Sequence, residues 1–448
     1  MSKHYSIRYS VHYSNLVAIC VLACCAVVPT CAQELLRVND AVRRAVQKNY
    51  DIIIASDEAE AARRGDSWAT AGAYPSATAG ASVNTARVAI DQKFSSGTTA
   101  RQRGVEQTAT QAFAHMQWRV FDGMKMFATK ERLAQIRERG ESALRQQVSA
   151  TILTTMSTYY ALVQTDEQLW VTERMLQMVE ERKRIADVRL SSGLSSRSDV
   201  LQARIDVNDA LASLVSLRAQ RRQTEISLLR CMGQDSSGSV RCADTVQVDS
   251  TINLAALRAA LATANESVLQ ALSNIRISQA AKREAASAGY PGLELQAGYV
   301  FNRSQNSAGF ALFNENNGFN VGANLSVPLL NGWRTETEME IKEVQIQQQQ
   351  HIAENVKRSV VAEFEGTAEE YRAACTMLPM LRESMDLATE NSTIALERFR
   401  RSDITSTEIR AIQLEVLQRS LQLLQAAVRA KVAELRLRML AGTLSGGE

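Results

Sequence analysis

The chain has little of what bends or interrupts a helix. Only 5 Pro and 21 Gly occur in 448 residues, and aromatic side chains make up 5%. So few Pro and Gly favour long uninterrupted helices, and the scarcity of aromatics favours close packing between helices through small and aliphatic side chains. The formal net charge is only +3, and basic residues do not cluster. We therefore expect no nucleic-acid partner.

Catalytic and cofactor-binding motifs are also missing from the sequence. After residue 32 only two His occur, His115 and His351, in segments of different expected structure. The sequence has no zinc-protease His pair, phosphate-binding Gly loop, dinucleotide fingerprint or nucleophile elbow. We therefore expect a protein that is not an enzyme and that holds no cofactor or metal.

A targeting segment begins the sequence. Lys3 and Arg8 are followed by 13 apolar residues from Leu16 to Val28. This pattern predicts a signal peptide over residues 1–32. Lipid modification at Cys24 or Cys31 is an alternative, although the preceding residues fit a lipobox poorly. No later apolar run approaches the roughly 18 residues of a membrane-spanning helix.

Three cysteines remain after the signal segment. Cys231 and Cys242 are separated by a Gly/Ser-rich stretch, and in an oxidising compartment they could form a disulfide. Two free thiols are the alternative. Cys375 lies in the middle of an expected helix and is predicted to be a thiol in the protein core.

Two pairs of segments alternate between apolar and polar residues. Around Ala77–Val83 and Ala112–Val120, and again around Leu293–Phe301 and Phe319–Val327, every second residue is apolar. This period of two predicts one β-hairpin in residues 76–121 and another in 291–330. The joining loops are expected near residues 95–99 and 302–318.

The remaining sequence has helical periodicity. Residues 124–190 contain no Pro and a single Gly, which predicts a helix of about 100 Å at about 1.5 Å per residue. Apolar residues at three- and four-residue steps give this helix a coiled-coil seam. Further helices are expected over 39–72, 198–231, 254–288, 335–400 and 406–440, with interruptions at Gly366 and Pro379.

The two halves of the sequence repeat one plan. Tyr74-Pro75 recurs as Tyr290-Pro291, and Phe121-Asp122-Gly123 recurs as Leu330-Asn331-Gly332. From Gly123 onward the spacing is constant at 209 residues as far as Gly193 and Ser402. We therefore expect a single body over 33–448, built of one repeat over 33–233 and another over 250–442.

Two hairpins supply only four strands, which is too few to span a membrane alone. A spanning sheet must close on itself, and the smallest such barrels have eight strands. Several copies would therefore have to share one barrel. Trp118 and Trp333 flank the strand-to-helix junctions, where an interfacial aromatic belt belongs; ordinary core packing is the alternative.

This duplicated plan resembles the TolC family of outer-membrane efflux proteins, also called outer membrane factors. The resemblance rests on the Tyr-Pro pairs, the Asp122-Gly123 and Asn331-Gly332 junctions, and the turn from Arg189 to Gly193. It implies a mainly α fold with a small β part, in which a homotrimer forms a 12-stranded barrel in outer-membrane lipid and a periplasmic tunnel of 12 helices.

The resemblance also implies a passive exit duct for efflux or type I secretion. A periplasmic adaptor (membrane fusion protein) and an inner-membrane pump of RND or ABC type would dock on it. A soluble exported coiled-coil scaffold or adhesin is the rival hypothesis, but it leaves the matched hairpins unexplained.

Site residues follow from the resemblance by position from the two turns. Glu408 and Asp199 are candidates for a pore constriction; the alternative is that both are first-turn acids favoured by the helix dipole. The periplasmic tips are expected at residues 190–198 and 400–406. The adaptor-docking candidates there are Gly193, Leu194, Ser195, Ser402, Asp403 and Ile404. Because the second turn lacks a Gly, we expect Asp403 to be its left-handed residue.

Overall fold

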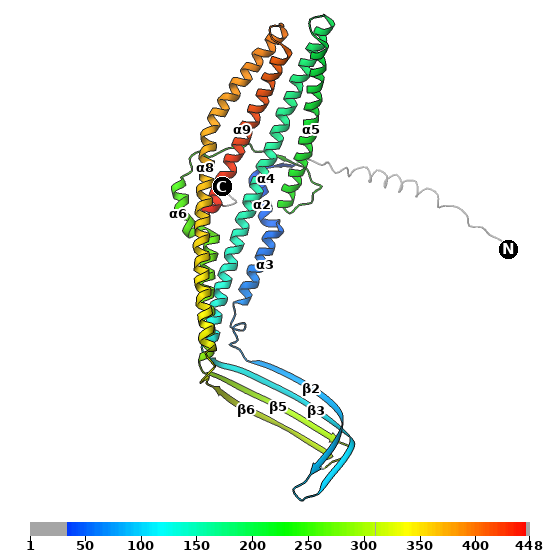
Figure 1. The fold of residues 1–448 in the computed structure, drawn as a ribbon, viewed down its shortest axis with the longest axis vertical. Coiled ribbons are helices and arrows are strands. Elements are labelled where there is room, and N and C mark those ends of the chain that lie inside the picture. The colour runs from blue at the N-terminus through cyan, green and yellow to red at the C-terminus, as the bar shows by residue number, and fades with distance from the viewer. Residues whose placement is uncertain (1–33, 310, 445–448) are drawn as a thin grey trace, which may run out of the picture.

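The computed structural model describes residues 34–309 and 311–444, and Figure 1 shows an elongated molecule with long helices at one end and a sheet at the other. The predicted signal peptide and the two candidate lipidation sites lie outside the described residues. The elements, in chain order, are β1 Glu34–Leu36, α2 Val38–Lys48, α3 Tyr50–Gly65, β2 Ser76–Lys93, β3 Thr99–Asp122, α4 Lys125–Ser191, α5 Arg197–Cys231, β4 Val240–Cys242, α6 Leu254–Ala264, α7 Glu266–Ala286, the 3₁₀ turn η1 Ser287–Gly289, β5 Gly292–Asn306, β6 Phe313–Ser326, α8 Arg334–Arg400 and α9 Ser406–Leu440.

The long helices confirm the predicted repeat. Helices α4 and α8 have 67 residues each, and α5 and α9 have 35 residues each. All four pairs of boundaries differ by 209 residues. The expected interruption of α8 is wrong, because the helix runs through both Gly366 and Pro379. A proline removes one helical N–H, and in a helix this long the turns on either side hold the chain in place.

The shorter helices differ from the prediction. The helices expected over 39–72 and 254–288 are each divided into two separate helices. Asn49 separates α2 from α3, and Asn265 separates α6 from α7. Each Asn side chain accepts hydrogen bonds from the first turn of the following helix, which is the role of an N-cap. Each also donates across the fold, from Asn49 Nδ2 to Cys231 O and from Asn265 Nδ2 to Leu440 O, both at 2.9 Å. The two repeats thus share one helix-breaking device.

The four long strands form one antiparallel sheet in the order β2-β3-β5-β6. The strands exceed the expected lengths: β2 and β3 have 18 and 24 residues and extend past the second hairpin, since β5 pairs with β3 only from Gln107 onward. The second loop is shorter than predicted, because β5 continues to Asn306 and β6 begins at Phe313. Within the described residues, β2 and β6 are unpaired on their outer edges.

The segment between the repeats contains a strand that the sequence did not indicate. Strand β4 pairs in parallel with β1, with Leu36 opposite Cys242. Leu36 is buried in one core cluster with Tyr159 and Leu228, from α4 and α5. This small sheet ties the beginning of the described chain to the middle of the helical body.

Left-handed backbone occurs at matching places in the two repeats. The positive-φ residues Gly123 and Met124 match Gly332 and Trp333, and Gly193 at φ 74° matches Ser402 at φ 68°. The expectation for Asp403 is therefore wrong. Helix-end hydrogen bonds explain this, because Ser402 N–H donates to Phe399 O and Asp403 N–H to Arg398 O, the same pattern as at Gly193 and Leu194.

Candidate functional site

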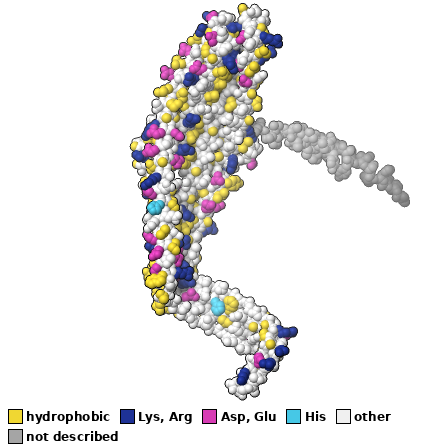
Figure 2. Space-filling model, viewed as in Figure 1, with side chains coloured by type: hydrophobic (Ala, Val, Ile, Leu, Met, Phe, Trp, Pro, Cys, Tyr) yellow, Lys and Arg dark blue, Asp and Glu magenta, His cyan; other side chains and the backbone are white. Residues whose placement is uncertain are grey.

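The sheet has one apolar face and one polar face. Register places Trp118, Leu295 and Ala323 in one row across three strands, and Met116, Ala297 and Val321 in the next such row. The alternate rows carry His115 with Gly298 and Asn320, and Gln117 with Gln296 and Gly322. Figure 2 shows few charged side chains on the sheet except toward its far end. A sheet of this kind can face lipid on one side and water on the other.

The two candidate interface tryptophans lie near the junction between sheet and helices. Trp118 is 38% exposed, and its indole Nε1–H donates to Ala73 O at 3.0 Å. Trp333 is 72% exposed and is the left-handed N-cap residue of α8. Neither side chain is fully buried in the single chain that the structure describes. Their contact with lipid remains a prediction.

At the tips, Asp199 and Glu408 take the same structural role. Ser196 Oγ accepts from Asp199 N–H at 3.2 Å, and Asp199 Oδ2 accepts from Ser196 N–H at 3.1 Å. Thr405 and Glu408 repeat this reciprocal pair at 3.2 and 2.7 Å. Both are capping boxes, which satisfy free N–H groups at a helix start. The acids are thus first-turn acids, as the alternative interpretation held, and these bonds use one oxygen of each carboxylate.

Hydrogen bonding favours the ionised form of both acids. Hydrogen bonds from Ser196 lower the pKa of Asp199 from its ordinary value, with the largest effect from the hydroxyl and the next largest from the backbone N–H. Hydrogen bonds from Thr405 lower the pKa of Glu408 in the same way, with the largest effect from the backbone N–H and the next largest from the hydroxyl. Both groups therefore carry full negative charge at neutral pH. A pore-lining role for Glu408 or Asp199 is compatible with this geometry and stays a prediction.

The docking candidates at the tips differ in exposure. Leu194 is 74% exposed, beside the exposed Gly193, whereas Ile404 is 9% exposed and packs with Phe399 and Ile409 in the core of the second tip. Ser402 and Asp403 are exposed. Of the two apolar candidates, only Leu194 offers its side chain to a partner.

A buried ion pair near the tips was not found from the sequence. Arg182 of α4 is 1% exposed and pairs with Asp206 of α5, and its Nη1 donates to Gln413 Oε1 of α9 at 3.1 Å. Arg410 Nε of α9 donates to the second oxygen of Asp206 at 3.1 Å. Three helices from both repeats therefore meet in one polar cluster. The internal repeat could not reveal this ion pair, because the second repeat has Asn391 and Glu415 at the positions equivalent to Arg182 and Asp206.

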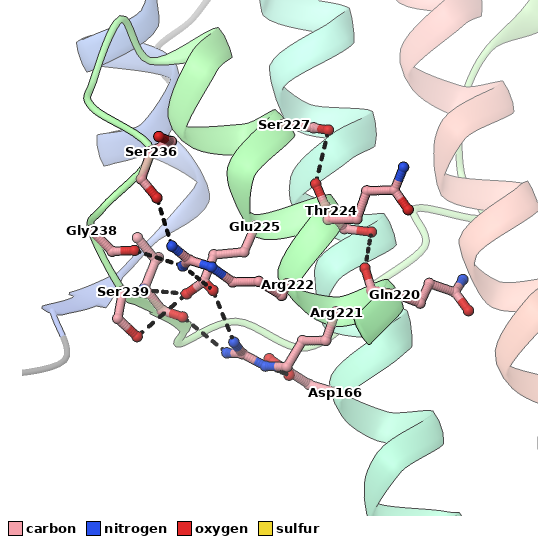
Figure 3. Close-up of polar contacts among 12 residues, drawn as sticks. Asp166, Gln220, Arg221, Arg222, Thr224, Glu225, Ser227, Ser236, Gly238 and Ser239 are labelled. Carbon is pink, nitrogen blue, oxygen red and sulfur yellow. Dashed lines mark hydrogen bonds and ion pairs between the residues drawn. The ribbon is translucent and has the colours of Figure 1, made fainter. Parts of the chain in front are cut away.

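A second polar cluster holds the segment between the repeats (Figure 3). Glu225 of α5 is 2% exposed and accepts from Val240 N–H at 2.7 Å and from Arg222 at 2.8 Å. Arg222 also donates to the carbonyls of Ser236 and Gly238. Burial raises the pKa of Glu225, but these donors outweigh it, and the pKa lies below its ordinary value.

The second repeat has a matching acid. Glu434, which lies 209 residues after Glu225, is also 2% exposed and accepts from Asp249 N–H at 3.2 Å and from Lys431. The two buried glutamates therefore fix the two ends of the segment from Val240 to Asp249, halfway along the helical body.

Cys231 and Cys242 are both free thiols, so the disulfide that the sequence left open is not formed in the structure. Burial raises the pKa of Cys242 to about 12. No group of three or more metal-ligating side chains occurs among the described residues. A helix both long and apolar enough to cross a membrane is likewise not found in the part of the chain that the structure describes.

The sequence model of the outer membrane efflux protein family matches residues 41–234 and 256–443, one match in each repeat. The chain belongs to this family. It is thus a relative of the TolC-type outer-membrane channels, as the resemblance implied. A search of curated protein sequences finds no match.

Solved channels share the fold at low sequence identity. The Campylobacter jejuni CmeC outer membrane channel is 14% identical, with a TM-score of 0.78 over 92% of this chain and 87% of that one. The outer-membrane channel OprN is 16% identical, with a TM-score of 0.76 over 91% and 90%. VceC from Vibrio cholerae is 16% identical, with a TM-score of 0.74 over 90% and 96%. The chain therefore shares the fold of these solved channels over at least 90% of its length.

Proposed function

We propose that three copies of this chain form a passive exit duct in the outer membrane. The observation that carries this proposal is the four-stranded sheet, which has one apolar face and, among the residues that the structure describes, two unpaired edges. Open edges cannot face lipid, so the sheet must be completed by other copies. Three copies supply twelve strands, an even number within the range of outer-membrane barrels.

The helices continue the duct away from the membrane. Helices α4 and α8 have 67 residues each, about 100 Å at about 1.5 Å per residue. With α5 and α9 they give twelve long helices in a trimer, a tunnel long enough to cross much of the periplasm. The body 33–448 thus acts as one unit of two repeats, with barrel segments in 76–121 and 291–330 and no catalytic role.

The tips at residues 190–198 and 400–406 are the docking surface in this proposal. A periplasmic adaptor joins them to an inner-membrane pump of RND or ABC type, which supplies the energy for efflux or type I secretion. The exposed Leu194 is the apolar contact of this surface. The buried Ile404 supports the second tip from inside.

Reconstitution tests the proposal. The mature protein, purified in detergent and added to a planar lipid bilayer, should insert and give discrete, long-lived steps of ohmic current. Heat-denatured protein in the same detergent is the control. Protein that stays water-soluble without detergent and gives no current would support the scaffold hypothesis instead.

A further inference from the structure

The polar face of the sheet is nearly free of charge along most of its length. Alternate residues of β3, from Gln107 to Gln117, mark successive rows of this face across the strands. The side chains in these rows are hydroxyls, amides and a few apolar groups, with several Gly and one histidine, His115. Among the described residues of these rows, His115 is thus the one side chain that can gain or lose a proton near neutral pH.

The nearest charges on this face lie in the row beside the helices. Arg119 Nη2 and Glu294 Oε2 pair there at 3.8 Å. Arg119 is four residues along β3 from His115, about 14 Å at about 3.4 Å per residue. In the row of His115 itself, β2 and β6 contribute Thr78 and Asn320, which are uncharged. His115 therefore has no charged neighbour from any strand that the structure describes.

The imidazole of His115 is held against the wall of the sheet. Gly298 lies opposite on β5, and a Cβ there would lie 2.5 Å from His115 Nδ1 and 2.9 Å from Asn320 Oδ1. The absence of a side chain at Gly298 thus makes room for the imidazole. The Phe113 ring lies beside it, with the two ring centroids 4.9 Å apart. His115 is still partly exposed, so water and protons reach it.

Closing the barrel adds no charge near His115. The strands that meet between copies are β2 and β6, the two edges of the sheet. Over these rows their polar-face residues are Ser, Thr, Asn, Gly and Ala. In a trimer the polar face surrounds the water-filled lumen, and three copies of His115 line it. Protonation of His115 then changes the wall of this part of the lumen from neutral to positive.

We propose that His115 determines how the ion selectivity of the barrel depends on pH. This inference rests on the proposed duct, because it assigns the polar face to the lumen. With neutral imidazoles the middle of the barrel has no charge preference of its own. With protonated imidazoles it attracts anions and repels cations, as rings of basic side chains do in other channels.

The acids at the tips do not obscure this response. The hydrogen bonds that lower the pKa of Asp199 and Glu408 keep both carboxylates ionised in mildly acidic solution. Any selectivity that these acids produce is therefore nearly constant over the range in which histidine changes its charge. The one other histidine after residue 32, His351, is exposed on α8, outside the sheet.

Reversal potentials in a KCl gradient test the proposal, at about pH 8 and about pH 5.5. Salt near 0.1 M keeps the Debye length at about 10 Å, so that the wall charge is felt in the lumen. For the wild-type duct the ratio of K⁺ to Cl⁻ permeability should fall at least about twofold at the lower pH. His115→Gln should abolish most of this fall. His351→Gln is the matched control and should keep it.

Thiol labelling places a charge at the same position without a change of pH. His115→Cys, treated with a water-soluble methanethiosulfonate that carries a trimethylammonium group, should lose cation selectivity at about pH 8 as the protonated wild type does. Met116→Cys is the matched control, because its side chain is on the apolar face and should not react. Treated wild-type protein controls for the three native thiols, Cys231, Cys242 and Cys375.

The outcomes separate this inference from the duct itself. A channel whose pH response survives His115→Gln or disappears in His351→Gln would overturn the role of His115 and leave the duct intact. So would a wild-type channel without a pH response, or a position 116 that reacts as readily as position 115. Wild-type protein that gives no channel current at either pH would overturn the duct.

Discussion

The buried cluster at Arg182 should be destabilised much more by loss of the Asp206 carboxylate than by loss of the Arg182 guanidinium. Asp206→Ala removes the carboxylate that pairs with the Arg182 guanidinium, which is only 1% exposed and whose Nε has no hydrogen-bond partner among the described residues. Within residues 34–309 and 311–444, the hydrogen bond that remains to Arg182 is then the one to Gln413. Breaking a buried pair in this way costs about 3–5 kcal/mol. Arg182→Met leaves Asp206 bonded to Arg410 and Gln202, so it should cost only about 1–2 kcal/mol.

Hydrogen exchange is the suitable assay, because a trimer of long helices need not unfold in one step. Asp206→Ala should speed local opening of residues 178–186 by about 10² to 4 × 10³ times, and Arg182→Met by about 5 to 30 times. Arg184→Met is the matched control on the same helix, since its partner Glu181 is bonded at the surface and exchange should hardly change. Equal effects of the two buried variants, or a larger effect of Arg182→Met, would refute the reasoning.

Further predictions concern the tips and the middle of the helical body. Glu408→Gln keeps a capping-box acceptor but removes the charge, so it should lower cation selectivity in single-channel recordings while assembly stays normal; unchanged selectivity would mean that Glu408 faces away from the pore. Asp199→Asn should have the smaller effect. Cysteines at Ser195 and Ser402 should crosslink to the adaptor, whereas crosslinking from Asn306 instead would reverse the proposed orientation. Glu225→Ala leaves Arg222 and Val240 N–H without their buried acceptor, so limited proteolysis within residues 233–249 should quicken at least about tenfold; no change would show that the segment is held by other contacts.

Most of the fold could be predicted from local sequence. The long helices follow from the scarcity of Pro and Gly, and the hairpins follow from strict alternation of apolar and polar residues. The constant spacing of the repeat then predicted the positions of the turns. Helix α9 begins and ends where expected, at Ser406 and Leu440.

What the sequence did not reveal depends on distant contacts. Asn49 and Asn265 break helices because their side chains reach the carbonyls of Cys231 and Leu440, which no local pattern shows. The Arg182–Asp206 pair likewise joins helices whose register is set only by folding. Ser402 takes the left-handed position because the last bonds of α8 fix where the helix ends, against the preference of Ser itself.

The positions of Asp199 and Glu408 could be predicted from the sequence, and so could their first-turn role, whereas their pore role stays a prediction. Asp199 and Glu408 lie at the tips, and each completes a capping box within its own helix. Whether their free oxygens also meet around a pore depends on the other copies. The number of copies is therefore the central question.

Native mass measurement of the detergent-solubilised protein answers that question most directly. We predict a complex of three chains, since three copies of the four-stranded sheet close a barrel of twelve strands. A single chain that remains soluble and monodisperse after detergent is removed would contradict the account.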